Sequence, residues 1–139
     1  MRKIDKFIIH CSATPEGGDY TVQQIREWHV KGNGWRDIGY HYIIYRDGSI
    51  HTGRTIEQIG AHTTGYNSHS IGICYIRGYA ADGKTPKDTR TEAQRRALIK
   101  LLRELKAKYP SATIHGHNEF ANKACPSFIV KNDPELCAI

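Results

Sequence analysis

Residues 91–109 contain the sequence feature that most restricts the fold. Thr91 and Gln94 have the spacing of a capping box, in which the two side chains bond each other's backbone N–H groups at a helix start. Apolar residues then recur every three or four positions and form one stripe: Ala97, Leu98, Leu101, Leu102 and Leu105. Pro110 ends the pattern, because proline cannot continue a helix. The sequence therefore predicts a helix whose apolar face must be covered by another element.

Short apolar runs predict the strands that could cover this face. Residues 7–9, 71–76 and 112–115 read as strands, with 71–76 in the middle of the sheet. Residues 40–53 are expected to form two strands joined at the Asp47-Gly48 turn. Thr21 and Gln24 form a second capping box, which predicts a shorter helix ending at 31–34. Val22, Ile25 and either Trp28 or His29 should share one face of that helix.

Alternating strands and helices indicate an α/β fold, with a central mixed β-sheet flanked by helices. No linker, repeat or low-complexity tract divides the 139 residues, so we expect one domain over 1–139. The net charge is +6, from 20 basic and 14 acidic residues. The basic residues are scattered rather than clustered, and we therefore expect no nucleic-acid partner.

Four cysteines occur, at 11, 74, 125 and 137. Residues 1–9 contain too short an apolar run for a signal peptide or a membrane span. We therefore expect synthesis in a reducing cytoplasm, no membrane association, and thiols that are free or metal-bound.

Residues 115–127 (HGHNEFANKACPS) concentrate metal-binding side chains. Zinc prefers imidazole and thiolate ligands, and a catalytic zinc takes three of them and leaves one position open. The candidates are His10, at the end of the first strand, with His115, His117 and Cys125. If the chain is extended, His115 and His117 share a face, so spacing alone does not choose between them. A closed four-ligand site that uses both histidines is the structural alternative.

Cys11 should point to the opposite face of the strand from His10, so we interpret it as a small buried hydrophobe. Glu119 could orient a ligand, but a surface carboxylate is the simpler expectation. Trp28 and Trp35 are interpreted as packing residues.

Four stretches together resemble one family: FIIHCSAT, GYHYIIYRDGSIHTGR, AHTTGYNSHSIGICYIRG and HNEFANKACPSF. They are similar to zinc-dependent N-acetylmuramoyl-L-alanine amidases of the type-2 family, and most closely to its small phage lysozyme members. Peptidoglycan recognition proteins share that fold. The resemblance extends from residue 6 to residue 128, with the motifs in the family's order.

The resemblance implies one zinc per chain at the rim of the sheet, held by His10, His117 and Cys125. It also implies that Tyr40 and Lys123 are the catalytic pair. Without the resemblance, strand packing would explain Tyr40 equally well, and a solvated surface position would be the preferred interpretation of Lys123. The loop 61–67 is similar to the family's substrate-cleft loop. This similarity implies that His62, Thr63 and Asn67 contact the substrate.

The implied activity is hydrolysis of the amide between N-acetylmuramic acid and L-alanine in peptidoglycan. The implied setting is a monomeric phage or prophage endolysin that reaches the cell wall through a separate membrane pore. Two rivals stay open. One is a recognition protein that binds peptidoglycan without cutting it, and the other is a cytoplasmic amidase that trims recycled wall fragments. In this family the loss of the cysteine ligand marks the binding proteins, and Cys125 is present.

Overall fold

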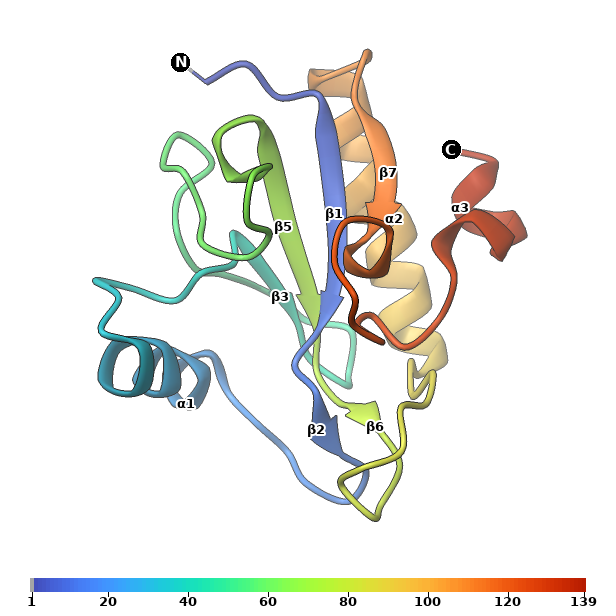
Figure 1. Cartoon of the computed structure of the whole chain (residues 1–139). Coiled ribbons are helices and arrows are strands. Elements are labelled where there is room, and N and C mark those ends of the chain that lie inside the picture. The colour runs from blue at the N-terminus through green and yellow to red at the C-terminus, as the bar shows by residue number, and fades with distance from the viewer. Residues whose placement is uncertain (1) are drawn as a thin grey trace.

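A computed structural model describes residues 2–139 and contains a five-stranded sheet with a helix against each face (Figure 1). The strand order is β4-β3-β5-β1-β7. The strands are β1 (Lys6–Cys11), β3 (Tyr42–Ile44), β4 (Ile50–Thr52), β5 (Ser70–Tyr75) and β7 (Thr113–Gly116). β3 and β4 pair antiparallel, whereas the other neighbours pair in parallel. The expected mixed α/β sheet, with β5 at its centre, is confirmed.

β1 and β5 read as apolar runs because they are buried on both faces, as parallel strands usually are. Their register pairs Ile9 with Ile73 and His10 with Cys74. Side chains alternate along each strand, so Ile9 and Ile73 point to one face while His10 and Cys74 point to the other. A short second sheet, β2 (Thr14–Pro15) with β6 (Gly78–Tyr79), continues beyond the end of β1.

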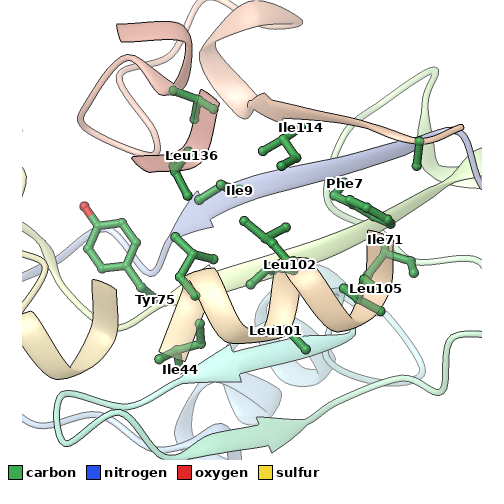
Figure 2. Packing of buried hydrophobic residues seen from close by; sticks show 14 of the residues in the cluster. Phe7, Ile9, Ile44, Ile71, Tyr75, Leu101, Leu102, Leu105, Ile114 and Leu136 are labelled. Atoms are coloured by element: carbon green, nitrogen blue, oxygen red, sulfur yellow. The ribbon is translucent and has the colours of Figure 1, made fainter. Parts of the chain in front are cut away.

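Helix α2 (Glu92–Lys108) covers the face that carries Ile9 and Ile73 (Figure 2). The capping box of Thr91 and Gln94 is present, as expected. The predicted leucine stripe is buried against the sheet: Leu98, Leu101, Leu102 and Leu105. Gln94 is also buried, and its Nε2 donates to the carbonyls of Ile44 and Ile76 at 3.3 and 3.2 Å. The start of the helix is thereby bonded directly to the sheet.

Helix α1 (Val22–Glu27) packs on the other face, where Val22 and Ile25 contact Ile38 and Ile43. Its capping box at Thr21 is present as predicted. The helix then widens into a π-turn over Trp28–Gly32. Trp28 is 45% exposed, whereas His29 is half-buried. Of the two residues expected as alternatives on the face of Val22 and Ile25, Trp28 is therefore not the buried one.

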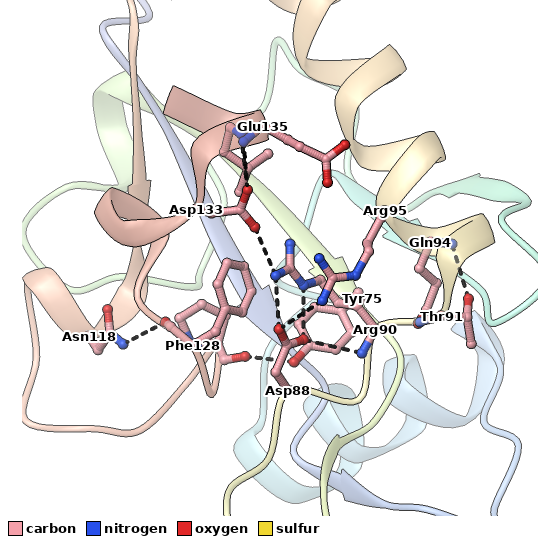
Figure 3. Close-up of polar contacts among 12 residues, drawn as sticks. Tyr75, Asp88, Arg90, Thr91, Gln94, Arg95, Asn118, Phe128, Asp133 and Glu135 are labelled. Carbon is pink, nitrogen blue, oxygen red and sulfur yellow. Dashed lines mark hydrogen bonds and ion pairs between the residues drawn. The ribbon is translucent and has the colours of Figure 1, made fainter. Parts of the chain in front are cut away.

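The C-terminal segment adds helix α3 (Pro134–Cys137), which Asp133 caps through bonds from the N–H groups of Glu135 and Leu136. Leu136 and Val130 pack into the core beneath α2. Arg90 joins Asp88, Asp133 and Phe128 into one network at this end of the molecule (Figure 3).

Within residues 2–139 the four cysteines form no disulfide; Cys11 and Cys74 are buried, and Cys137 is exposed. None of the helices within residues 2–139 combines the length and the apolarity needed to cross a membrane.

Candidate metal centre

The metal-binding side chains converge where β1 and β7 end. These strands run in parallel, so their carboxyl ends meet at the same edge of the sheet. His10 lies near the end of β1, and His117 begins the 3₁₀ turn that follows β7. The loop after this turn brings Cys125 against both. One ligand atom from each of the three residues lies within 4.8 Å of the others.

The donor set fits zinc in both chemistry and spacing. Nδ1 of His10 lies 3.7 Å from Sγ of Cys125. A nitrogen and a sulfur on one tetrahedral zinc are separated by roughly 3.6 Å, from typical Zn–N and Zn–S bond lengths. In the metal-free chain the neighbouring Cys11 thiol and burial raise the pKa of the Cys125 thiol, whereas the backbone N–H of Cys11, which donates to its Sγ at 3.3 Å, acts in the direction of the thiolate. The Cys11 side chain belongs to the core on the α2 face, as the strand alternation predicts.

His115 is turned away from this group. Its Nδ1 lies 2.9 Å from Oε1 of Glu119, and its Nε2 lies 2.6 Å from Oγ1 of Thr113. Glu119 also accepts from the backbone N–H of Gly116 at 2.8 Å, so its carboxylate orients His115 and is more than a solvated surface group. The four-ligand alternative that used His115 therefore has no support in the geometry.

Burial sets the protonation of the two histidines. It lowers the pKa of His10 well below its ordinary value, and the neighbouring His62, His117 and Lys123 lower it further. Burial and the charge of Lys123 also lower the pKa of His117. Both imidazoles are therefore neutral near neutral pH, which is the form that binds a metal.

A cavity of about 490 Å³ opens over the three ligands. Tyr40 and Lys123 both line it, Lys123 from an exposed position and Tyr40 from a half-buried one. Burial raises the pKa of Tyr40 well above its usual range, so its phenol keeps its proton and can donate a hydrogen bond. A second cavity of about 530 Å³ lies around Tyr45 and Arg46, and its walls include none of the candidate metal ligands or catalytic residues.

Of the three loop residues expected to contact substrate, only His62 lines the cavity. His62 lines the cavity, but it is buried and its Nδ1 lies 2.9 Å from Nε2 of His10. Thr63 is 2% exposed and lies outside the cavity wall. Oδ1 of Asn67 accepts from the backbone N–H groups of His62 and Thr63, both at 2.9 Å. Asn67 thus holds the loop, and neither Thr63 nor Asn67 lines the cavity, so their expected substrate contacts stay a prediction.

Three aromatic residues that the sequence did not point to line the same cavity: His29, Trp35 and Tyr79. Trp35 packs on His29 with ring centroids 4.8 Å apart, and Nδ1 of His29 accepts from the N–H of Gly39 at 2.9 Å. Trp35 therefore packs against a neighbouring ring, as expected, and also lines the cavity. The π-turn directs His29 toward the cavity, and no periodicity in the sequence signals that turn.

Comparison with known proteins gives one consistent family. Residues 1–128 match the sequence profile of the N-acetylmuramoyl-L-alanine amidase family. The endolysin of Enterobacteria phage K11 is 46% identical over 127 residues, which cover 91% of this chain and 83% of that one.

Two solved structures have the same fold. The N-acetylmuramoyl-L-alanine amidase LysC from Clostridium intestinale superposes with a TM-score of 0.82 at 29% identity, covering 99% of this chain and 85% of the other. A mutant of Drosophila PGRP-LB in complex with tracheal cytotoxin gives a TM-score of 0.81 at 26% identity, covering 97% and 84%. The chain therefore belongs to the N-acetylmuramoyl-L-alanine amidase family.

Proposed function

We propose that this protein is a zinc-dependent N-acetylmuramoyl-L-alanine amidase that cuts the amide between N-acetylmuramic acid and L-alanine in peptidoglycan. One observation carries the proposal. His10, His117 and Cys125 form a zinc-type donor set in the wall of an open cavity that also presents Lys123 and Tyr40. The similarity to phage endolysins supports a lytic role, with the enzyme acting on the wall after release through a separate pore.

Zinc held by these three side chains would polarise the scissile carbonyl and lower the pKa of a water molecule. The chain's own residues do the rest. Lys123 places a positive charge at the cavity, where it stabilises negative charge that develops on the carbonyl oxygen. Tyr40, whose ring centroid lies 5.2 Å from that of His10, offers a protonated phenol that positions the carbonyl oxygen or a proton in transfer. Trp35 and Tyr79 supply aromatic wall surface for the sugar and the stem peptide.

A recognition protein that binds wall fragments without cutting them is the second candidate, because PGRP-LB shares the fold. The cysteine ligand favours the enzyme. A binder needs no thiolate in its cleft, whereas Cys125 lies 3.7 Å from Nδ1 of His10 with its sulfur bonded by a backbone N–H.

The test compares two kinds of variant on purified peptidoglycan. The assay follows new L-alanine amino termini, and elemental analysis reports zinc per chain. Lys123→Ala should lose about 10²–10³ in rate and Tyr40→Phe about 10²–10⁴, with zinc content unchanged. Cys125→Ala should lose zinc and activity together. Lys100→Ala, an exposed lysine on α2, is the matched control for lost charge.

Two results would count against this proposal. Near wild-type rates in both Lys123→Ala and Tyr40→Phe would remove these residues from the mechanism. Wild-type protein that binds the wall but releases no amino termini would favour the recognition protein.

A further inference from the structure

The two ring nitrogens of His10 face different partners. Nδ1 faces the metal group, 3.7 Å from Sγ of Cys125. Nε2 faces the protein interior, 2.9 Å from Nδ1 of His62 and 3.3 Å from Oγ1 of Thr63. Of these two nitrogens, Nδ1 is therefore the one placed to bind the metal, and it can do so only if the ring proton is on Nε2.

The position of that proton depends on His62. A neutral imidazole has one donor and one acceptor nitrogen. If His62 donated from Nδ1, Nε2 of His10 would have to accept, and the proton of His10 would move to Nδ1, in the metal position. If Nδ1 of His62 accepts instead, the proton of His10 stays on Nε2 and Nδ1 keeps its lone pair. The tautomer of His62 thus decides whether His10 is ready to bind a metal.

The second arrangement is the one that metal binding at Nδ1 of His10 requires, and the surroundings can accommodate it. Nε2 of His62 lies 3.3 Å from Oγ of the fully buried Ser70, so a proton on that nitrogen has an acceptor. Thr63 Oγ1 lies 3.0 Å from Nδ1 of His62, and its hydroxyl can donate there while it accepts from His10. Because both hydroxyls can donate or accept, these contacts can run in one direction, from His10 through His62 to Ser70.

The fold also fixes where the His62 ring lies. A Cβ atom at Gly60 or at Gly72 would be 2.7 Å from Cδ2 of that ring, closer than real contacts allow. Only glycine leaves room for the imidazole at both positions. Asn67 holds the loop from the other side, through the backbone N–H groups of His62 and Thr63. The two glycines and Asn67 together hold the His62 ring in one place, which a solvent-exposed loop side chain would not require.

We propose that His62, assisted by Thr63, is a positioning residue that holds the proton of His10 on Nε2 and so keeps Nδ1 available for zinc. This inference rests on the proposed function, because it assumes that His10 binds zinc. Outer partners of metal-bound histidines are typically worth about 10–100-fold in metal affinity.

The experiment measures zinc affinity by competition with a chelator, in protein that circular dichroism shows to be folded. His62→Phe removes the acceptor and should weaken zinc binding about 10–100-fold. His62→Asn places an amide oxygen near the position of Nδ1 and should restore most of the affinity. Thr63→Val keeps the shape of the side chain and should have a smaller effect in the same direction. His51→Phe removes a histidine of β4 that does not line the cavity and is the matched control, with affinity unchanged.

Ring nitrogen and proton NMR signals of the zinc-loaded wild type give a second readout that needs no variant. They should show a proton on Nε2 of His10 and on Nε2 of His62. A proton on Nδ1 of His62 would overturn the inference, and so would wild-type zinc affinity in His62→Phe. If the wild type binds zinc, either result leaves the proposed function standing. A wild type that binds no zinc would overturn both.

Discussion

Arg90 is the residue whose removal should most clearly weaken the connection between the C-terminal segment and the rest of the molecule. Its side chain is 4% exposed and lies at the centre of the network in Figure 3. Nε and Nη2 donate to the two carboxylate oxygens of Asp88, both at 2.9 Å, and Nη2 also donates to Asp133 at 2.9 Å. The guanidinium lies 3.6 Å from the centroid of the Phe128 ring. Replacement by methionine keeps an unbranched chain and removes every one of these bonds.

The magnitude follows from what the substitution leaves behind. Asp133 is 9% exposed and Asp88 is 27% exposed, so a buried carboxylate loses its cation and a half-buried one keeps only the weaker contact with Arg95. Removal of one partner of a buried ion pair typically costs about 3–5 kcal/mol. We expect the lower end, about 3 kcal/mol, because water can reach Asp88. Such a loss lowers the melting temperature by roughly 10 °C in a chain of this size.

The pKa shifts of the two carboxyls also determine how the stability difference between wild type and Arg90→Met changes with pH. Burial opposes ionisation of Asp88 and of Asp133, but the hydrogen bonds and charge of Arg90 outweigh it and lower the pKa of both carboxyls. Groups with a lowered folded-state pKa stabilise the fold above their ordinary value of 3.8, and that stability is lost as the pH falls through the folded-state pKa. The difference between wild type and Arg90→Met should therefore narrow below about pH 4.

Urea denaturation at pH 7 and at pH 3 measures both effects. Arg95→Met is the matched control, because Arg95 is 40% exposed and lies 3.5 Å from the same Asp88 carboxylate. An exposed pair of this kind is worth about 0–1 kcal/mol. Equal losses in Arg90→Met and Arg95→Met would refute the argument that burial gives the Arg90 network its strength.

Three further results are expected. Leu102→Ala, at a position with 0% exposure, should reduce the free energy of unfolding by about 2–5 kcal/mol in chemical denaturation. Burial lowers the pKa of His41 from 6.5 to about 4, so the unfolded chain takes up a proton first and stability should fall as the pH drops from 6.5 to about 4. His41→Phe should flatten that part of a stability–pH curve, and an unchanged slope would contradict the assignment. A thiol reagent should modify the exposed Cys137 first and the buried Cys74 only on unfolding, and rapid labelling of Cys74 in folded protein would contradict its burial.

Much of the architecture could be predicted because local patterns and packing agree. The two capping boxes mark the starts of α1 and α2, and the leucine stripe marks the face of α2 that the sheet covers. The π-turn at Trp28–Gly32 could not be predicted, since one extra residue in a turn has no distinct side-chain pattern. His29 lies in this turn and lines the cavity, whereas Trp28, the other residue expected on the helix face, is exposed.

The metal centre shows a similar division. Residue types alone identify the candidate ligands. They do not distinguish His115 from His117, because both would lie on the same face of an extended chain. The structure separates them because β7 ends at Gly116 and a 3₁₀ turn begins at His117. The proposed role of His62 could not be predicted from the sequence either, because the space for its ring depends on glycines in two different segments, Gly60 and Gly72.

The most direct test of a zinc amidase is the cleavage of purified peptidoglycan before and after removal of the metal. Wild-type protein as purified should contain about one zinc per chain and release new L-alanine amino termini. Chelator treatment should abolish the release, and one equivalent of zinc should restore it. Full cleavage by zinc-free protein, or no release of amino termini by zinc-loaded protein, would contradict the assignment.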